Sequence, residues 1–317
     1  MLGLGLLFAG GYGFVEGSAG LALSLRFPKM LMGATIVAFG TTLPETFVSV
    51  QAALEGSSGI SYGNAIGSII CNTALIAGLS VAVRPGKVDP KSFSLPASFF
   101  FAAALIYSVT AWTSGWFARW MGILFLLGFI LYMIVIGRHI KKHPKTAEYD
   151  VVTAKGRFRP KDLTQQIIYM IIGLTAIVLG SRLLVENGVI MAKAMGVADS
   201  VIGLTLVALG TSLPELVTTI IGLAGGHEEL SLGNMIGANL LNIVLVSGAA
   251  ITISPFRVPA EKTIGGVNSS LIVDIPLMLI VMAVLCLPAL KAGRLKRWQG
   301  IVLLCVYAAF TFFQFKS

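Results

Sequence analysis

The sequence contains little charge. Lys, Arg, Asp and Glu make up only 12% of its 317 residues, whereas 56% are hydrophobic, and the mean hydropathy is +0.88. Several uncharged stretches reach the length of about 20 residues that an α-helix needs to cross a bilayer. The scarcity of charge excludes an ordinary soluble domain. It predicts an all-α protein that crosses the membrane many times.

Cysteine and histidine are also scarce, with three residues of each. All three cysteines lie in apolar segments, which argues against a disulfide framework. The histidines lie between apolar segments and are expected to be solvated: His139, His143 and His227. No His or Cys pair is spaced for a transition metal, and no EF-hand spacing is present. The apolar segments hold no Ser–His or Cys–His pair, so we do not expect an enzyme.

Ten apolar segments are long enough to span a bilayer. They cover approximately residues 3–25, 31–55, 61–83, 94–112, 117–137, 166–190, 199–223, 230–252, 268–289 and 297–315. The long polar stretch 138–165 carries eight basic residues, which predicts a cytoplasmic loop with both termini outside. In this topology 17 of the 23 basic residues lie at the cytoplasmic side. The net charge of +9 therefore reflects insertion into the cell membrane and not binding of nucleic acid.

The polar loop divides the chain into two related halves. We expect an N-terminal five-helix repeat (1–137), a cytoplasmic basic loop (138–165) and a C-terminal five-helix repeat (166–317). Residues 33–45 match 203–215 at 9 of 13 positions, and 63–72 match 233–242 at 5 of 10, both at an offset of 170. Two copies separated by an odd number of crossings insert in opposite orientations, so the repeats are predicted to be inverted.

Each repeat carries an acidic residue inside an apolar segment. The strings are Gly-Thr-Thr-Leu-Pro-Glu, ending at Glu45, and Gly-Thr-Ser-Leu-Pro-Glu, ending at Glu215. A carboxylate in hydrocarbon is costly and therefore points to a functional site. The proline before each glutamate lacks an N–H, so we expect kinks in the second and seventh helices. The carbonyl of Gly40 and its neighbours should lose their usual partners there and line a cavity or bind a ligand.

Hydroxyl groups accompany both glutamates. They lie four and three residues earlier, on the same helix face: Thr41 and Thr42 in the first repeat, Thr211 and Ser212 in the second. Carboxylate, carbonyl and hydroxyl oxygens suit hard cations. Two carboxylates could neutralise Ca²⁺, with carbonyls of Thr41, Thr211 or their neighbours completing its shell. Na⁺ would suit the carbonyls and hydroxyls.

A second repeated string, Gly-Asn-x-Ile-Gly, begins at residues 63 and 233. Its glycines are spaced to let helices approach closely. Asn64 and Asn234 lie nearer the predicted helix starts, so we expect caps or packing contacts there. Ser68 and Asn72 share one helix face, and Asn242 is equivalent to Asn72. Because these amides recur beside the glutamates, we assign them to the site.

These paired strings resemble the cation/calcium exchanger superfamily, and prokaryotic sodium/calcium exchangers in particular. The matching alpha-repeats are residues 33–78 and 203–248, and the ten-helix layout extends the resemblance over nearly the whole chain. It implies Ca²⁺ bound by Glu45, Glu215 and the main-chain oxygens of Thr41 and Thr211. It implies two sets of Na⁺ ligands: Ala38, Thr42 and Ser68, mirrored by Ala208, Thr211 and Ser212. It also implies that the first and sixth helices slide to switch access.

The sequence departs from the family pattern at three positions. Ala238 replaces the usual serine of the eighth helix, which removes one hydroxyl and leaves the sodium stoichiometry open. Ile69 replaces an asparagine, a change that should affect packing more than ion binding. Asn242 stands where some relatives carry aspartate, an acid linked to potassium, so it argues against potassium transport.

The combined prediction is an antiporter that exchanges Na⁺ for Ca²⁺ by alternating access. It needs no cofactor and no obligatory protein partner; its partners are the transported cations and the lipid bilayer. A proton/calcium antiporter on the same fold remains the alternative, although the hydroxyls and carbonyls around each glutamate favour sodium. A cation channel is a further alternative. Channels usually build their filters from oligomeric rings or re-entrant loops, whereas one chain supplies both halves here.

Overall fold

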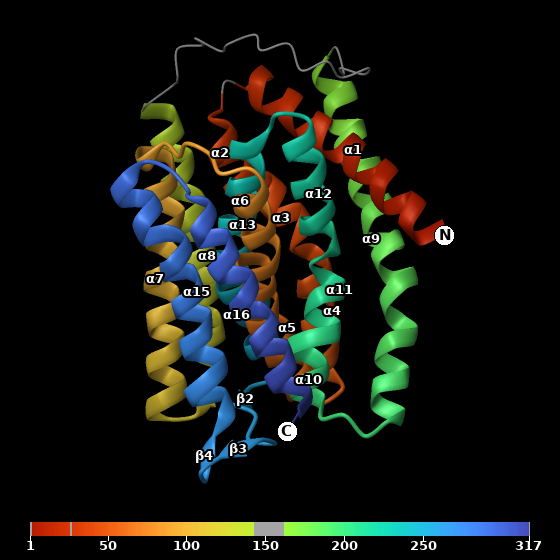
Figure 1. The fold of residues 1–317 in the computed structure, drawn as a ribbon, viewed down its shortest axis with the longest axis vertical. Helices are drawn as coiled ribbons and strands as arrows, with labels where there is room; N and C mark the ends of the chain where they lie inside the picture. The colour runs from red at the N-terminus through yellow and green to blue at the C-terminus, as the bar shows by residue number, and fades with distance from the viewer. Residues whose placement is uncertain (1, 26, 143–161, 317) are drawn as a thin grey trace.

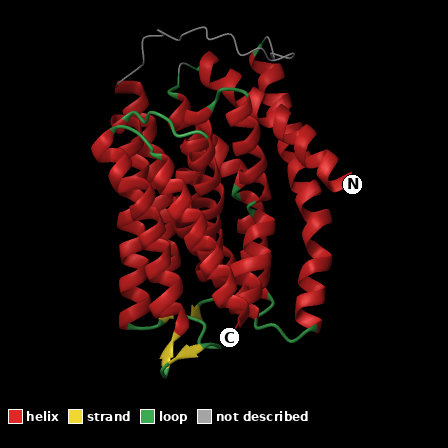
Figure 2. Ribbon diagram, viewed as in Figure 1, coloured by secondary structure: helices red, strands yellow, loops and turns green. Residues whose placement is uncertain are grey.

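The computed structural model describes residues 2–25, 27–142 and 162–316 (Figure 1). Most of the basic loop expected at 138–165, including His143, lies outside these residues. Helices make up nearly all of the described chain (Figure 2). Nine of its helices are long and apolar enough to cross a membrane, or ten when a bent pair is counted as one span. The all-α, multiply spanning fold predicted from the sequence is therefore confirmed.

Several spans combine α-helical with π-helical segments, denoted η. The first half contains α1 (Leu2–Ser24), α2 (Lys29–Met32), η1 (Gly33–Val37), α3 (Ala38–Thr41), α4 (Leu43–Leu54), α5 (Ser58–Ile70), η2 (Cys71–Ala77), α6 (Gly78–Val83), α7 (Pro90–Thr113), β1 (Trp116–Phe117) and α8 (Arg119–Lys142). The second half contains α9 (Leu163–Ala194), α10 (Asp199–Ile202), η3 (Gly203–Val207), α11 (Ala208–Thr211), α12 (Leu213–Ala224), α13 (Glu228–Leu241), η4 (Asn242–Ser247), α14 (Gly248–Ile253), β2 (Phe256–Arg257), β3 (Thr263–Ile264), β4 (Val267–Asn268), η5 (Ser270–Asp274), α15 (Ile275–Ala292) and α16 (Arg297–Lys316).

Four interrupted spans build the centre of the molecule. We call α2 to α4 the first kinked span and α10 to α12 the second kinked span. The segments α5, η2 and α6 form the first partner span, and α13, η4 and α14 form the second partner span. Each partner span changes from α- to π-helix at nearly equivalent positions, one residue apart in the repeat register: Cys71 and Asn242 are the first π-helical residues. Such π-helical turns are frequent at functional sites.

Helices α1 and α9 lie side by side at one edge of the bundle and run antiparallel (Figure 1). A Cβ added at Gly10 would lie 2.6 Å from the carbonyl oxygen of Gly173, and one at Gly180 would lie 2.7 Å from that of Gly3. As residue numbers increase along α1, the residues that they contact in α9 have decreasing numbers. Gly3 and Gly10 are 170 residues before Gly173 and Gly180, so this pairing maps onto itself when the halves are exchanged, as inverted repeats require.

The kinked spans pack against the partner spans of the opposite half. Gly33, in the first kinked span, lies so close to Leu230 of the second partner span that a Cβ would meet its carbonyl oxygen. The equivalent Gly203 approaches Ile60 of the first partner span, where a Cβ would lie 2.8 Å from the carbonyl oxygen. Small residues allow this approach between backbones. The two halves thus interlock at the centre and do not form separate domains.

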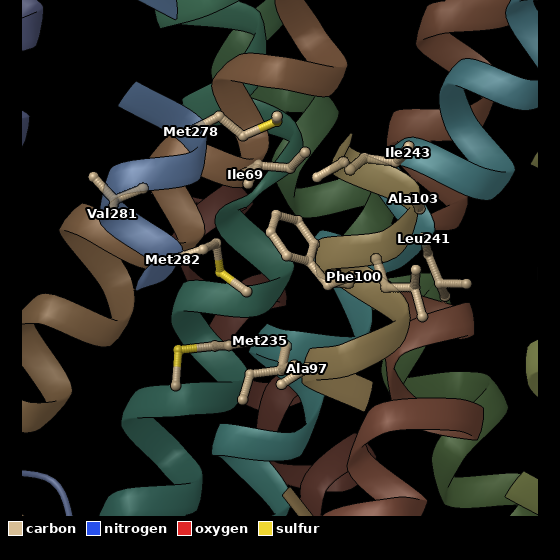
Figure 3. Packing of buried hydrophobic residues seen from close by; sticks show 14 of the residues in the cluster. Ile69, Ala97, Phe100, Ala103, Met235, Leu241, Ile243, Met278, Val281 and Met282 are labelled. Atoms are coloured by element: carbon tan, nitrogen blue, oxygen red, sulfur yellow. The ribbon is translucent and has the colours of Figure 1, made fainter. Parts of the chain in front are cut away.

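The main apolar core lies where α7 and α15 pack against the partner spans. Figure 3 shows Ile69, Phe100 and Met282 directed into the same interior space. Their side chains are fully buried, with relative exposures of 0%. This rigid packing supports the backbone that carries the polar residues described below.

The two ends of the bundle carry different loops. At one end, residues 86–88 pair with 293–295, and Val88 donates its N–H to the carbonyl of Gly293 at 3.0 Å. At the opposite end, β1 pairs antiparallel with β2, and the C-terminus lies nearby (Figure 1). Lys262 contacts the C-terminal helix α16, since its Nζ donates a hydrogen bond to the carbonyl of Phe313 at 2.9 Å. Basic loops and strand-bearing loops therefore lie at opposite ends.

Two expectations about histidine are wrong. His139 lies within α8 and not in a loop. His227 is only 8% exposed, and its Nε2 lies 3.7 Å from Oε1 of Glu16 in α1. The segment before α13 folds back against α1, which sequence position alone did not reveal. Glu16 makes this polar contact from the second half of α1, about two turns before its last residue, Ser24, whereas the side chain of Glu186 is outside the described set.

Candidate cation site

A helix break precedes each buried glutamate. In the first kinked span, Thr42 separates α3 from α4 with φ −83° and ψ −2°, and the segments meet at 42°. Ser212 breaks the second kinked span in the same way, with φ −83° and ψ 3°, although Asp199–Ala224 still forms one span. The proline falls in the first turn of the following helix, where its missing N–H costs little.

The break leaves fewer bare carbonyls than the sequence suggested. The Gly40 carbonyl, which Pro44 deprives of its usual donor, accepts a backbone N–H from the helix cap instead. The Ala38 carbonyl accepts the N–H of Thr42 at 2.9 Å, and the Ala208 carbonyl accepts that of Ser212 at 3.0 Å. A carbonyl oxygen has two lone pairs. Ala38 and Ala208 therefore each retain capacity for a further ligand.

Glu45 and Glu215 lie in the first turns of α4 and α12 and are both 0% exposed. None of their four carboxylate oxygens has a hydrogen-bond partner. The two carboxyl groups lie within electrostatic range of each other, with Thr211 beside Glu45 and Thr41 beside Glu215. The start of each helix favours negative charge through the helix dipole. The structure thus brings together two acids that are far apart in sequence.

Other buried polar atoms without hydrogen-bond partners belong to four further predicted site residues. These residues are also 0% exposed: Thr42, Asn72, Ser212 and Asn242. With the glutamates they contribute eight oxygen atoms and two amide nitrogens. Buried polar groups normally have partners. These atoms come from all four interrupted spans, and their oxygens are of the types that coordinate a hard cation.

The two halves differ at the hydroxyl of Ser68. Ser68 Oγ lies 3.4 Å from Thr211 Oγ1, which joins the first partner span to the second kinked span. The equivalent residue in the other half is the fully buried Ala238, so Thr41 has no such neighbour. The asymmetry noted in the sequence therefore lies next to the glutamates.

Asn64 and Asn234 have a role that we did not predict. Each is the seventh residue of its helix and not a cap. Thr211 Oγ1 donates to Asn64 Oδ1 at 2.9 Å. In the reciprocal contact, Thr41 Oγ1 donates to Asn234 Oδ1 at 3.0 Å. The expectation of helix caps is therefore wrong, whereas both residues do make contacts between helices. In the sequence, the only indication of this role was that Asn64 and Asn234 occupy equivalent positions of the two repeats, 170 residues apart.

Two further hydroxyls support these amides. Asn64 Nδ2 donates to Ser49 Oγ at 2.8 Å, and Asn234 Nδ2 donates to Thr218 Oγ1 at 3.2 Å. Sequence analysis missed both residues. Ser49 lies four residues after Glu45, on the same helix face, and this spacing could have indicated it.

The ligand types favour a hard cation. Among the described residues, no group of three His, Cys, Asp or Glu side chains is arranged to hold a metal ion. Beyond the two carboxylates, the described residues around them offer hydroxyls, amide oxygens and main-chain carbonyls. Ca²⁺ accepts six to eight such oxygens, whereas most transition metals prefer nitrogen or sulfur.

These features define a class: a helical membrane protein in which two related halves enclose an acidic, oxygen-rich site. Comparison with known proteins identifies the family. The model of the family described as sodium/calcium exchanger protein matches residues 1–137 and 165–316. The chain therefore belongs to the sodium/calcium exchanger family and is an integral membrane exchanger.

Related proteins match over nearly their full lengths. The sodium/calcium exchanger MaX1 of Methanosarcina acetivorans is 29% identical over 343 residues, covering 98% of this chain and 95% of MaX1. The membrane protein MJ0091 of Methanocaldococcus jannaschii is 33% identical over 313 residues, covering 97% and 94%. The solved structure of the sodium-calcium exchanger NCX_Mj soaked with 2.5 mM Na⁺ and 0.1 mM Ca²⁺ is 30% identical. It superposes with a TM-score of 0.75 and covers 97% of this chain and 94% of that one.

Proposed function

We propose that this protein is a secondary active antiporter that exchanges Na⁺ for Ca²⁺ at Glu45 and Glu215. One observation carries the proposal: two fully buried carboxylates, one from each half, face a common region without hydrogen-bond partners. Two like charges in a low-dielectric interior are costly unless a cation or protons compensate them. A divalent ion neutralises both at once. The names of MaX1 and NCX_Mj, and the soaking of NCX_Mj with Na⁺ and Ca²⁺, support this choice of ions.

The proposed ligands divide by ion. Ca²⁺ binds the carboxylates of Glu45 and Glu215 and the main-chain oxygens of Thr41 and Thr211. Na⁺ binds hydroxyl and carbonyl groups on both sides: Ala38, Thr42 and Ser68, and Ala208, Thr211 and Ser212. Asn72 and Asn242 add amide oxygens from the partner spans. The buried, unpaired atoms of several of these residues support the assignment.

Competition for the glutamates couples the two fluxes. When the site is empty, two bare carboxylates face a low-dielectric barrier, and reorientation is costly. Binding of Ca²⁺ or of sodium ions removes that cost and permits reorientation. The empty carrier therefore does not return, and each Ca²⁺ movement requires a return movement of sodium.

Access changes when α1 and α9 slide across the remaining helices. The interface is largely apolar and forms a cluster separate from the main core, with Phe14 of α1, Ile177 of α9 and Val217 of α12 among its members. Apolar contacts are non-directional, so they tolerate sliding better than hydrogen bonds do. Glu16 and His227 form a polar contact across this interface at 3.7 Å.

The proposed orientation places the loop 138–165 in the cytoplasm and both termini outside the cell membrane. The repeats 1–137 and 166–317 then insert in opposite directions. The grouping of basic residues such as Lys87 and Arg294 in paired loops at one end of the bundle supports this orientation. The strand-bearing loops at the other end face outward.

The decisive experiment measures radioactive Ca²⁺ uptake into proteoliposomes loaded with Na⁺, with pH clamped on both sides. We expect uptake that requires the outward sodium gradient and stops when K⁺ replaces internal Na⁺. Uptake that ignores sodium but follows a pH gradient would establish proton/calcium exchange instead. Steady Ca²⁺ current without any counter-ion would identify a channel. Either of these results would overturn the proposed function.

A further inference from the structure

The reciprocal pairs of Thr211 with Asn64 and Thr41 with Asn234 bring hydroxyl protons next to the glutamates. Thr211 lies beside the Glu45 carboxyl, and Thr41 lies beside that of Glu215. A threonine hydroxyl has one proton and can donate only one strong hydrogen bond. Its direction therefore decides whether the neighbouring carboxylate is engaged by a donor or left free.

The orientation of Asn64 follows from its other contact. Its Nδ2 donates to the main-chain carbonyl of Glu45 at 3.1 Å. A carbonyl oxygen can only accept, so the amide nitrogen must face it, and the amide oxygen must face Thr211. The Thr211 hydroxyl consequently donates to Asn64, at 2.9 Å.

The orientation of Asn234 follows from a relay. Thr218 Oγ1 donates its proton to the main-chain carbonyl of Glu215 at 3.1 Å. It can therefore only accept from Asn234, whose Nδ2 lies 3.2 Å away. The amide oxygen of Asn234 then faces Thr41, whose hydroxyl donates to it at 3.0 Å. In both halves, the backbone of the acidic residue sets the direction of the amide.

These contacts account for the state of the carboxylates. Each threonine also lies near a carbonyl in its own helix, at 3.4 Å for Ala38 and 3.3 Å for Ala208, but the amide oxygens are nearer. With both protons directed to the nearer amide oxygens, no described donor lies in hydrogen-bonding distance and geometry to the carboxylate oxygens of Glu45 and Glu215. The threonine oxygens keep their lone pairs available.

We propose that Asn64 and Asn234 are positioning residues that hold the hydroxyl protons of Thr211 and Thr41 away from the glutamates. The carboxylates then remain available as cation ligands. This inference rests on the proposed function, because it assumes that Glu45 and Glu215 bind Ca²⁺. It adds two residues, each acting through a threonine of the opposite half.

Equilibrium Ca²⁺ binding without sodium tests the first pair. In Asn64→Ala, the released Thr211 hydroxyl turns to Glu45 and competes with the cation, so we expect Ca²⁺ affinity to fall about 10-fold. The second substitution Thr211→Val removes the competing proton. Affinity in the double variant should therefore match that of Thr211→Val alone. A purely structural role of Asn64 predicts that the double variant still carries the full loss, and this outcome would overturn the inference.

The other half supplies a second test if Asn64→Ala does not fold. Asn234→Ala should weaken Ca²⁺ binding, and adding Thr41→Val should remove that loss. Asn239→Ala is the matched control, because this buried amide donates to Thr73 Oγ1 at 2.7 Å and to Met282 Sδ at 3.1 Å, on the side of α15. It should lower thermal stability and leave Ca²⁺ affinity unchanged.

Failure of the inference and failure of the proposed function give different results. If Glu45→Gln and Glu215→Gln bind Ca²⁺ normally, the proposed site is wrong. If these variants lose binding but the double variants show no rescue, only the positioning role of the amides is wrong.

Discussion

The two halves of the site agree in their charged groups and backbone but differ in their hydroxyls. Both place a glutamate in the first helical turn after a break, and both exchange a threonine–asparagine hydrogen bond. However, the position equivalent to Ser68 in the second half is occupied by Ala238, which has no hydroxyl. Asn64 reaches the carbonyl of Glu45 directly, whereas Asn234 acts through Thr218, which replaces Val48.

The comparison separates two requirements. Neutralising a divalent ion needs one carboxylate from each side, so the halves must remain alike in charge. A monovalent ion can be held by carbonyls and a changing set of hydroxyls, so this part of the site tolerates divergence. On the proposed function, the two halves contribute equally to calcium binding and unequally to sodium binding.

The largest expected effect tests the shared part of the site. Glu45→Gln and Glu215→Gln should each reduce Ca²⁺ uptake by about 100-fold or more, because each leaves one carboxylate to compensate the two charges of the buried Ca²⁺. Sodium-driven uptake in proteoliposomes measures the loss. The comparison predicts similar losses for the two variants. Normal uptake by either one would mean that the halves do not share the ion.

Close packing provides a second comparison. Gly33→Ala should lower unfolding stability by about 1–3 kcal/mol, because the new Cβ would meet the Leu230 carbonyl in the second partner span. Gly203→Ala should cost less, since its nearest atom lies at 2.8 Å. Thermal unfolding in detergent gives the order. Gly137→Ala is the control, because nothing lies within 4 Å of its Cβ position. An equal cost at residues 33, 137 and 203 would contradict this account of the interlock.

The hydroxyl asymmetry can be removed from either side. Ser68→Ala should raise the Na⁺ concentration for half-maximal exchange about 3- to 10-fold. This range corresponds to the loss of one neutral hydrogen-bonding group. Ala238→Ser should strengthen it, because it restores a hydroxyl beside Thr41. Half-maximal Na⁺ and the Hill coefficient of Ca²⁺ efflux measure both changes. Equal shifts in Ca²⁺ affinity would show instead that the hydroxyls serve both ions.

The smallest expected effect concerns one buried carbonyl in η1. Tyr132 Oη donates to the Ala34 carbonyl at 2.7 Å, whereas the equivalent residue, Leu204, has no described tyrosine contact. Tyr132→Phe should therefore cost about 1 kcal/mol of unfolding stability. Chemical denaturation compares it with Tyr12→Phe, a control at a 39% exposed position. A change no larger than the control would show that this bond does not stabilise the first half.

Sequence analysis predicted the all-α membrane fold and selected the acidic residues, because both leave local patterns. Hydrophobic runs indicate spans, and the 170-residue offset indicates equivalent positions. The same offset was present for Asn64 and Asn234, but it could not show what they contact. His227 was misjudged for a similar reason, since its burial depends on a helix more than 200 residues earlier.

The amino-acid sequence by itself determined that the chain crosses the membrane many times, that it contains a duplication and that each half carries an acidic residue in an apolar segment. Hydrophobicity and repetition are properties of the chain. Tertiary structure alone decided which groups meet. The hydrogen bond from Thr41 to Asn234 joins residues 193 positions apart. Its direction depends on a backbone carbonyl and a relay hydroxyl that no local periodicity encodes.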